Sequence, residues 1–131
     1  MVIDSSALIA ILLGESEAEV FARAISSDQT RFLSAVSALE TAIVIESKKG
    51  PSGGMEFDLL LHEAGIEIVG MDLSQVKMAR RAYQKYGKGK HSAGLNLGDC
   101  CSYALSKANG EPLLFKGDDF SKTDVQAVVG V

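Results

Sequence analysis

Short apolar segments alternate with longer segments of helical periodicity along the chain, and this alternation constrains the fold more than any other feature. Apolar segments that are separated by helices form parallel strands, and a parallel sheet needs helices on both of its faces. We therefore predict an α/β fold with a doubly wound parallel sheet, in a single domain spanning residues 1–131. The predicted strands are Met1–Asp4, Arg31–Ala35, Ile66–Val69 and Pro112–Phe115, with a weak further strand at Val125–Val129.

Helical segments fill most of the chain between these strands. The predicted helices are Ser6–Leu13, Ser16–Ile25, Ser37–Lys48, Met55–Ala64, Asp72–Tyr86 and Asp99–Asn109. The Gly and Pro content of Lys49–Gly54 predicts a loop, because these residues interrupt regular structure. A second loop is predicted at Gly87–Leu97, before the last helix.

The composition favours a cytoplasmic protein. Hydrophobic residues make up 47% of the chain, but no apolar run reaches the roughly 18 residues that a membrane-spanning helix needs. The N-terminus lacks the charged region and cleavage site of a signal peptide. The only cysteines are the adjacent Cys100 and Cys101. Adjacent cysteines rarely bridge each other, so we expect reduced thiols, as is usual in the cytosol.

Acidic residues stand where the predicted strands end and helices begin. Asp4 ends the first strand, and Asp118 and Asp119 follow the last one. Glu40 lies in the helix after the second strand, and Asp99 opens the helix before the last strand. Ligands of an open parallel sheet bind beyond the carboxyl ends of its strands. These carboxylates are therefore predicted to converge on one edge.

Each of these residues also has a purely structural explanation. Ser37 and Glu40 have the spacing of a capping box, in which the glutamate bonds a backbone N–H. Asp99 lies where the first turn of a helix favours an acid, and Asp4 has the residue type of a helix cap. Asp118 and Asp119 follow a glycine and have the residue type of a turn. Taken together the structural explanation is weaker, because clustered carboxylates repel each other.

A cluster of carboxylates without Cys or His is typical of a site for Mg²⁺ or Mn²⁺. Such an ion polarises a phosphoryl oxygen and lowers the pKa of a bound water. The predicted chemistry is therefore phosphodiester hydrolysis. The chain has no Gly-rich phosphate loop ending in Lys and Ser or Thr, which argues against the use of nucleoside triphosphates.

The formal net charge is −4, which is unusual for a nucleic-acid-binding protein. One segment nevertheless concentrates basic residues: Arg80, Arg81, Lys85, Lys88 and Lys90. This run is either a solvated helix face and loop or a strip that contacts RNA phosphates. The second interpretation gains weight from the acidic cluster.

Four segments of the chain resemble the motifs of VapC-type toxins of the PIN-domain ribonuclease family. They are Val2–Ala10, Ser37–Ala42, Leu95–Cys100 and Leu113–Asp124, and they occur in order and at similar spacing. The resemblance implies a PIN-like three-layer α/β/α sandwich and an endoribonuclease that depends on Mg²⁺ or Mn²⁺ and blocks translation. It also implies the toxin half of a type II toxin–antitoxin pair, a VapB-like antitoxin partner and a toxin homodimer. Transfer RNA is a common target of similar toxins, and ribosomal and messenger RNA are the alternatives.

The resemblance also implies site residues. Asp4, Glu40 and Asp99 match the acidic positions of the family, and we expect Asp4 and Asp99 to be the main metal ligands. The usual fourth acidic position is occupied by Gly117. Asp118 or Asp119 must then serve, and Asp119 is favoured. Two further residues, Ser6 and Asn96, match supporting positions.

Two other functions stay open at this point. One is a catalytically inactive PIN domain that binds RNA, although the retained carboxylates argue against it. The other is a receiver-like module that accepts a phosphoryl group on an aspartate. A receiver needs an acidic pair after the first strand and an Asp after the third, whereas the third strand here continues as Val69-Gly70-Met71.

Overall fold

A parallel sheet of four strands forms the centre of the computed structural model, which describes residues 1–131. The strands are β1 (Val2–Ile3), β2 (Phe32–Ser34), β3 (Glu67–Val69) and β4 (Leu113–Leu114), in the order β3-β2-β1-β4. Every pairing between neighbouring strands is parallel, with Val2 opposite both Phe32 and Leu113. The chain leaves β1 toward β2 and β3 and returns on the other side of β1 to β4. The carboxyl ends of β1 and β4 therefore flank the point where the winding direction reverses.

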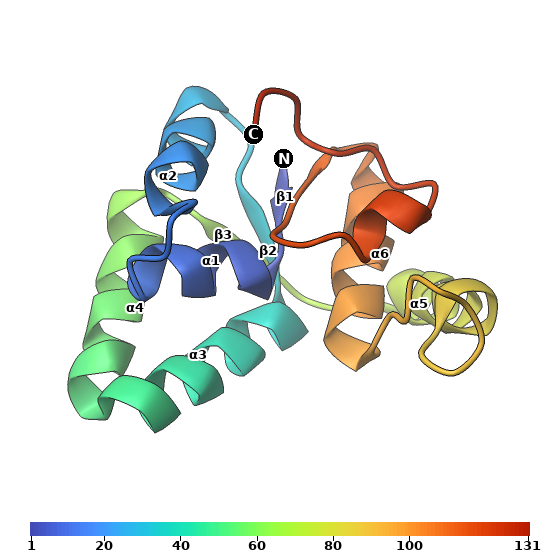
Figure 1. Cartoon of the computed structure of the whole chain (residues 1–131), viewed down its shortest axis with the longest axis horizontal. Coiled ribbons are helices and arrows are strands. Elements are labelled where there is room, and N and C mark those ends of the chain that lie inside the picture. Colours follow the sequence, from blue (N-terminus) through green and yellow to red (C-terminus); the bar gives the residue numbers. More distant parts are fainter.

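Helices cover both faces of this sheet (Figure 1). They are α1 (Ser5–Leu12), α2 (Ala18–Ser27), α3 (Ala35–Lys49), α4 (Pro51–Glu63), α5 (Leu73–Tyr86) and α6 (Leu97–Asn109), followed by the short 3-10 helix η1 (Phe120–Lys122). The α/β class and the three-layer sandwich predicted from the sequence are confirmed. None of the helices has the length and apolar character needed to span a membrane.

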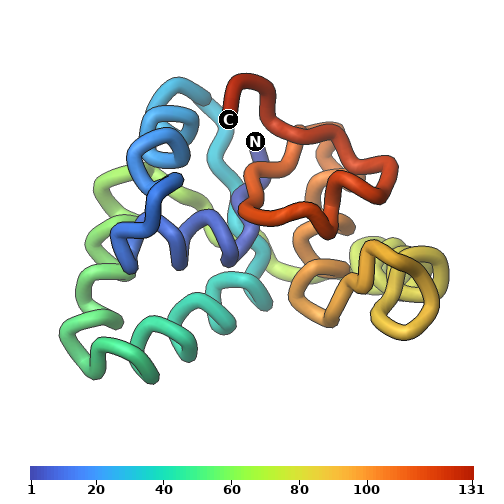
Figure 2. The backbone as a smooth tube through the Cα atoms, in the orientation of Figure 1, coloured from blue at the N-terminus to red at the C-terminus, as the bar shows by residue number.

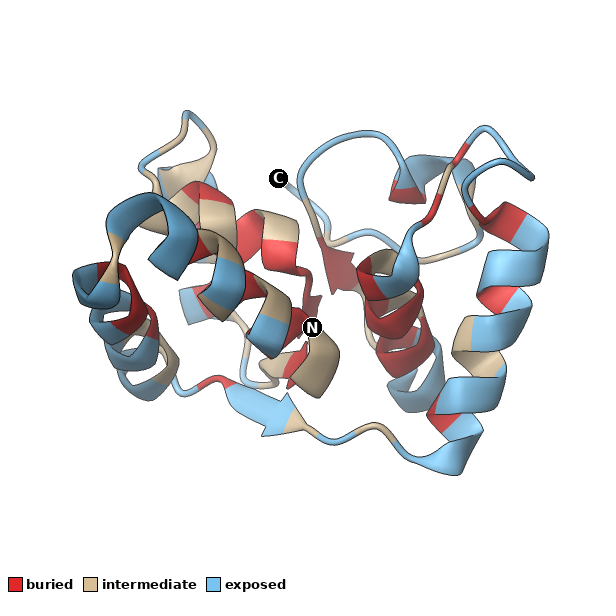
Figure 3. Cartoon of the chain, turned by 90° about the horizontal axis from the view of Figure 1, so that it is seen from below, coloured by how far each residue is buried: buried red, intermediate tan, exposed pale blue.

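Alternating side chains of the central strands build a separate hydrophobic core on each face. Ile3 and Leu114 pack with α1, α2, α3 and α4, whereas Val2 and Leu113 pack with α5, α6 and η1. These four strand residues have no exposed surface. The buried residues gather around the sheet and α6, while the edge strand β3 is largely exposed (Figure 3). Packing on both faces thus fixes the position of the central strands and of the carboxyl edge where they end.

Two predictions of secondary structure are wrong. Lys49–Gly54 is not a loop, because α3 runs to Lys49 and α4 begins at Pro51, with Gly50 as the single residue between them at φ 69°. Pro51 is tolerated in the first turn of α4. Gly53 and Gly54 lie inside α4, where a Cβ would meet Ile45 at 2.7 Å and Glu46 at 2.5 Å.

Val125–Val129 does not form a strand either. It makes one isolated parallel bridge, between Ala127 and Leu113. The bridge holds the end of the chain beside β4, and the two chain ends lie close together (Figure 2). Val125 and Val128 are partly buried against the two cores, whereas Val129 is 91% exposed.

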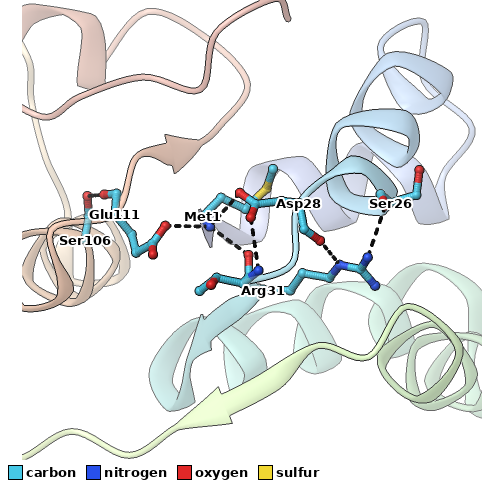
Figure 4. A network of polar contacts seen from close by, with 7 residues as sticks. Met1, Ser26, Asp28, Arg31, Ser106 and Glu111 are labelled. Atoms are coloured by element: carbon cyan, nitrogen blue, oxygen red, sulfur yellow. Dashed lines mark hydrogen bonds and ion pairs between the residues drawn. The ribbon is translucent and has the colours of Figure 1, made fainter.

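The amino edge of the sheet is held by a network around the N-terminal amine (Figure 4). The amine of Met1 donates to Asp28 Oδ2 at 2.9 Å, to the carbonyl oxygen of Thr30 at 2.7 Å and to Glu111 Oε2 at 2.9 Å. The hydrogen bond from this amine holds the pKa of Asp28 below its usual range. The network ties the start of β1 to the segments that lead into β2 and β4. It lies at the end of the sheet opposite Asp4.

Candidate active site

Asp4 is a buried carboxylate at the carboxyl end of β1, with only 2% of its surface exposed. Its Oδ2 accepts a hydrogen bond from the Ser6 backbone N–H at 3.0 Å, so it caps α1. Its Oδ1 accepts one from the Ser102 hydroxyl at 2.6 Å. The capping role inferred from the sequence is present, but it does not exclude a functional one. An N-cap needs only one carboxylate oxygen. The second oxygen of Asp4 accepts its hydrogen bond from α6 instead.

Glu40 has no capping role. Helix α3 begins at Ala35, after Ser34, two residues earlier than predicted, and Ser37 therefore lies inside the helix. The predicted capping box between Ser37 and Glu40 is absent, because Ser37 is fully buried and its hydroxyl pairs with Ser102 instead. The carboxylate of Glu40 extends to the start of α1, where the Ser5 hydroxyl donates to its Oε1 at 2.6 Å. This contact brings the acidic residue of α3 beside Asp4.

Asp99 is the third residue of α6 and forms a capping box with Asn96. The Asn96 side chain accepts from the Asp99 N–H at 2.9 Å, and Asp99 Oδ2 accepts from the Asn96 N–H at 3.0 Å. Burial raises the pKa of Asp99 to about 6, against the opposing effect of the Asn96 hydrogen bond. The negative charges of Asp4, Asp119 and Glu40 also raise it. The acidic side chains are thus close enough to repel each other.

Gly98 allows Glu40 to approach the first turn of α6. A Cβ at this position would lie 2.7 Å from Glu40 Oε1 and 2.9 Å from Oε2. Any larger residue would therefore displace the carboxylate. Gly98 lies in the motif that the resemblance identified, but its role was not foreseen, because the residue that needs the space comes from α3.

Asp118 and Asp119 both lie exposed after β4. Of the two, only Asp119 contributes to raising the pKa of Asp99, which favours it as the fourth acidic residue. The backbone carbonyl of Asp118 accepts from Ser121 in the turn before η1. Ser6 supports this loop, because its hydroxyl accepts from the Lys116 N–H at 3.0 Å.

Two buried serines of this site, Ser5 and Ser102, were not predicted from the sequence. Ser102 follows Asp99 by three residues and so lies on the same side of α6. The spacing of three residues from Asp99 is the only signal that the sequence offered for Ser102. The partner of its hydroxyl, Asp4, is 98 residues away along the chain.

The donor set of this site is suited to a hard divalent cation. Its side chains offer carboxylate and hydroxyl oxygens, and Asp99 bears the repulsion that a cation would relieve. The acidic side chains are not gathered into a group of three or more that could hold one ion directly. Mg²⁺ keeps several waters and takes only one or two carboxylates. The residues therefore fit such an ion, with Asp4 and Asp99 as candidates.

The predicted basic strip divides between two surfaces of the molecule. Arg80 and Lys88 line a mostly apolar hollow that also includes Asn96, the capping partner of Asp99. Arg81 and Lys85 line another hollow, beside Lys107 and Asp124. Lys90 lies in the following loop, with its Nζ 5.6 Å from the centre of the Tyr83 ring. Only the first pair shares a surface with a residue of the acidic site.

Comparison with known proteins agrees with this architecture. The model of the PIN domain family matches residues 1–126. The chain therefore belongs to the PIN-domain family.

Curated relatives define a narrower group. A protein named Ribonuclease VapC from Mycolicibacterium smegmatis is 57% identical over 128 residues, covering 98% of this chain and 99% of the relative. Ribonuclease VapC30 of Mycobacterium tuberculosis is 53% identical, covering 98% of each chain. Within the PIN domains, the chain belongs to the VapC ribonucleases, as the sequence motifs predicted.

Solved structures show the same fold at low sequence identity. Mycobacterium tuberculosis VapC20, described as a toxin that cleaves the sarcin–ricin loop, superposes with a TM-score of 0.78 at 15% identity and covers 97% of both chains. A toxin–antitoxin complex from Klebsiella pneumoniae gives a TM-score of 0.73 at 16% identity, covering 97% of this chain and 95% of the other. These similarities concern the fold alone.

Proposed function

We propose that this VapC protein is the toxin of a toxin–antitoxin pair and that it hydrolyses phosphodiester bonds of RNA with the help of Mg²⁺ or Mn²⁺. The observation that carries the proposal is the gathering of acidic side chains at the carboxyl edge of the sheet. Glu40 accepts from the Ser5 hydroxyl, next to Asp4, and it lies against Gly98, next to Asp99. The rise in the pKa of Asp99 through the charges of Asp4, Asp119 and Glu40 agrees with this arrangement. Asp4 and Asp99 would hold the ion. When bound, the ion neutralises phosphate charge and makes a water more acidic.

The protein's own side chains supply orientation and proton acceptors. Asp4 is fixed through both oxygens, one by the Ser6 N–H and one by the Ser102 hydroxyl. Glu40 is held through Oε1 alone, so its Oε2 is available to accept a proton from an attacking water. In the hydrolysis, the water oxygen bonds to phosphorus and one P–O ester bond breaks. The leaving oxygen takes up a proton.

The RNA substrate is proposed by class only. The name of VapC20 refers to a ribosomal RNA loop, but that protein is only 15% identical to this chain. Transfer RNA, which the resemblance favoured, is an equal candidate. A comparison of cleavage products from total RNA would identify the target. Either substrate is cytoplasmic, so we propose a cytoplasmic location for the protein.

Protein partners would cover apolar side chains that the isolated chain exposes. Leu39 and Ile43 project from α3 with 63% and 59% of their surface exposed. Leu73 and Leu97 are similarly exposed on α5 and α6, at 68% and 75%. We propose that a VapB-like antitoxin and a second copy of the toxin bind this protein. Measurement of its mass in solution, alone and co-expressed with its antitoxin, tests both statements.

Asp4→Asn gives the sharpest test of the proposed function. The substitution keeps an acceptor for the Ser6 N–H but removes the charge, so the protein should fold and lose RNA cleavage and Mn²⁺ binding. Asp72→Asn is the matched control, because Asp72 caps α5 through the Gln75 N–H at 2.8 Å. Cleavage of labelled RNA should persist in the control and cease in EDTA. Full activity of Asp4→Asn would contradict the proposal.

A further inference from the structure

Two buried serines from different helices form a chain of hydrogen bonds leading to Asp4. Ser37 on α3 and Ser102 on α6 have no exposed surface. The Ser102 hydroxyl donates to Asp4 Oδ1 at 2.6 Å. The hydroxyl oxygens of Ser37 and Ser102 are 3.0 Å apart.

The direction of the second hydrogen bond follows from the first. A serine hydroxyl has one proton, and that of Ser102 is donated to Asp4. Ser37 must therefore donate to Ser102, and the chain runs from Ser37 through Ser102 to the carboxylate. Successive hydrogen bonds of one direction polarise each other, which strengthens the bond to Asp4. The neighbouring Thr41 hydroxyl donates to the Ser37 carbonyl at 2.7 Å, so it does not compete for either serine hydroxyl.

This chain ties three parts of the site to one another. Asp4 follows β1, Ser37 belongs to the helix after β2, and Ser102 belongs to the helix that presents Asp99. The Ser6 N–H holds the other oxygen of Asp4. Rotation of the carboxylate about its Cβ–Cγ bond would break both contacts, so its orientation depends on Ser102 as well as on the helix cap.

We propose that Ser102, oriented by Ser37, is a positioning residue that holds the Asp4 carboxylate in the orientation needed to bind a divalent cation. The inference rests on the proposed function, in which Asp4 is a metal anchor. Groups that orient a metal ligand contribute measurably to affinity, and their loss costs about 10- to 100-fold. A role limited to packing would instead affect stability and leave the affinity for the ion unchanged.

The test compares Mn²⁺ affinity in variants that differ only in the hydroxyl. Ser102→Thr and Ser102→Val have side chains of equal shape, but only threonine keeps the donor. We expect threonine to retain the affinity and valine to lose at least about 10-fold, as measured by titration of the free Mn²⁺ signal in electron paramagnetic resonance. Ser37→Ala should cause a smaller loss, because Ser102 would keep its bond to Asp4.

Ser106→Ala is the matched control on the same helix. Ser106 is also buried, but its hydroxyl donates to the Glu111 backbone carbonyl, at the amino edge of the sheet (Figure 4). Its Mn²⁺ affinity should equal that of the unmodified protein, even if its melting temperature falls. Equal affinities for the threonine and valine variants would overturn the inference, as would an equal loss in Ser106→Ala. An unchanged Mn²⁺ affinity in Asp4→Asn would show that Asp4 does not bind the ion. That result would contradict the proposed function and this inference together.

Discussion

The carboxyl group of Asp99 makes the stability of the metal-free protein depend on pH. Its pKa rises from 3.8 to about 6, chiefly through burial and then through the charges of Asp4, Asp119 and Glu40. Folding therefore favours the protonated side chain. The corresponding contribution to stability is fully present below about pH 4 and is lost as the pH rises through about 6. Near neutral pH, the burial of the charged Asp99 and its repulsion by the neighbouring carboxylates therefore lower the stability of the metal-free protein.

We expect Asp99→Asn to stabilise the metal-free protein at neutral pH. Asparagine keeps an acceptor for the Asn96 N–H but has no charge to bury. In EDTA at about pH 7.5 its melting temperature should exceed that of the unmodified protein by roughly 2–4 °C, and the difference should vanish at about pH 4. RNA cleavage should be lost. A pH-independent difference would mean that packing, rather than charge, changes the stability.

Asp118 and Asp119 give a second prediction for single residues. The charge of Asp119 acts on Asp99, whereas Asp118 is not among the groups that shift this pKa. Asp119→Asn should therefore reduce RNA cleavage by at least about tenfold more than Asp118→Asn. Both residues are exposed, so both variants should keep the melting temperature of the unmodified protein. The opposite ranking would assign the fourth acidic position to Asp118.

At the scale of helices, Gly98 connects the geometry of α6 to that of α3. Alanine is the better helix former by about 1 kcal/mol, so Gly98→Ala should not prevent folding. Its Cβ would nevertheless force Glu40 to move, because the carboxylate oxygens are 2.7 and 2.9 Å from that position. We expect RNA cleavage to fall at least about tenfold. Gly70→Ala is the control, because no atom lies within 4 Å of a Cβ there.

The order of the elements could be predicted from the sequence, because each central strand carries a run of apolar residues and each helix a periodic one. The helical structure of Lys49–Gly54 could not be predicted in this way. Its glycines resemble those of a loop, but they allow α4 to pack against Ile45 and Glu46 of α3. Glycine has the same local appearance in either situation, and only the tertiary contact distinguishes them.

Asp4, Asp99 and Asp119 follow a strand or open a helix, and this position along the sequence made them candidates for the site. Glu40 was a candidate for a different reason, because it lies inside α3 and only its motif identified it. The buried hydroxyls could not be assigned in the same way. Ser37 has the local pattern of a cap, yet the helix begins before it and its hydroxyl contacts Ser102. Both residues become buried only when α3 and α6 pack together. A pattern read along one helix does not include that contact.

At the scale of the whole molecule, an acidic protein must hold RNA through a local positive field. Arg80 and Lys88 share a surface with Asn96, whereas Arg81 and Lys85 lie near Asp124. We expect Arg80→Ala with Lys88→Ala to weaken RNA binding and to lower its salt slope by about 1.4, since each phosphate contact of a single strand adds about 0.7. RNA affinity across a salt series measures this.

Arg81→Ala with Lys85→Ala removes the same charge and serves as the control. Its salt slope should stay close to that of the unmodified protein. An equal decrease in the two double variants would mean that overall charge, rather than the surface next to the acidic site, determines RNA binding.

The carboxyl edge of the sheet brings together residues from the start and the end of the chain, which are synthesised at different times. The Asp4 N–H donates to the Leu114 carbonyl, and the Ser6 hydroxyl accepts from the Lys116 N–H. A nascent chain that has not reached β4 lacks both contacts, and it also lacks Asp119. The acidic site therefore cannot assemble until nearly the whole chain has been translated. The RNA cleavage proposed for this site therefore requires a chain that extends through β4 to Asp119, and a shorter nascent chain would lack it.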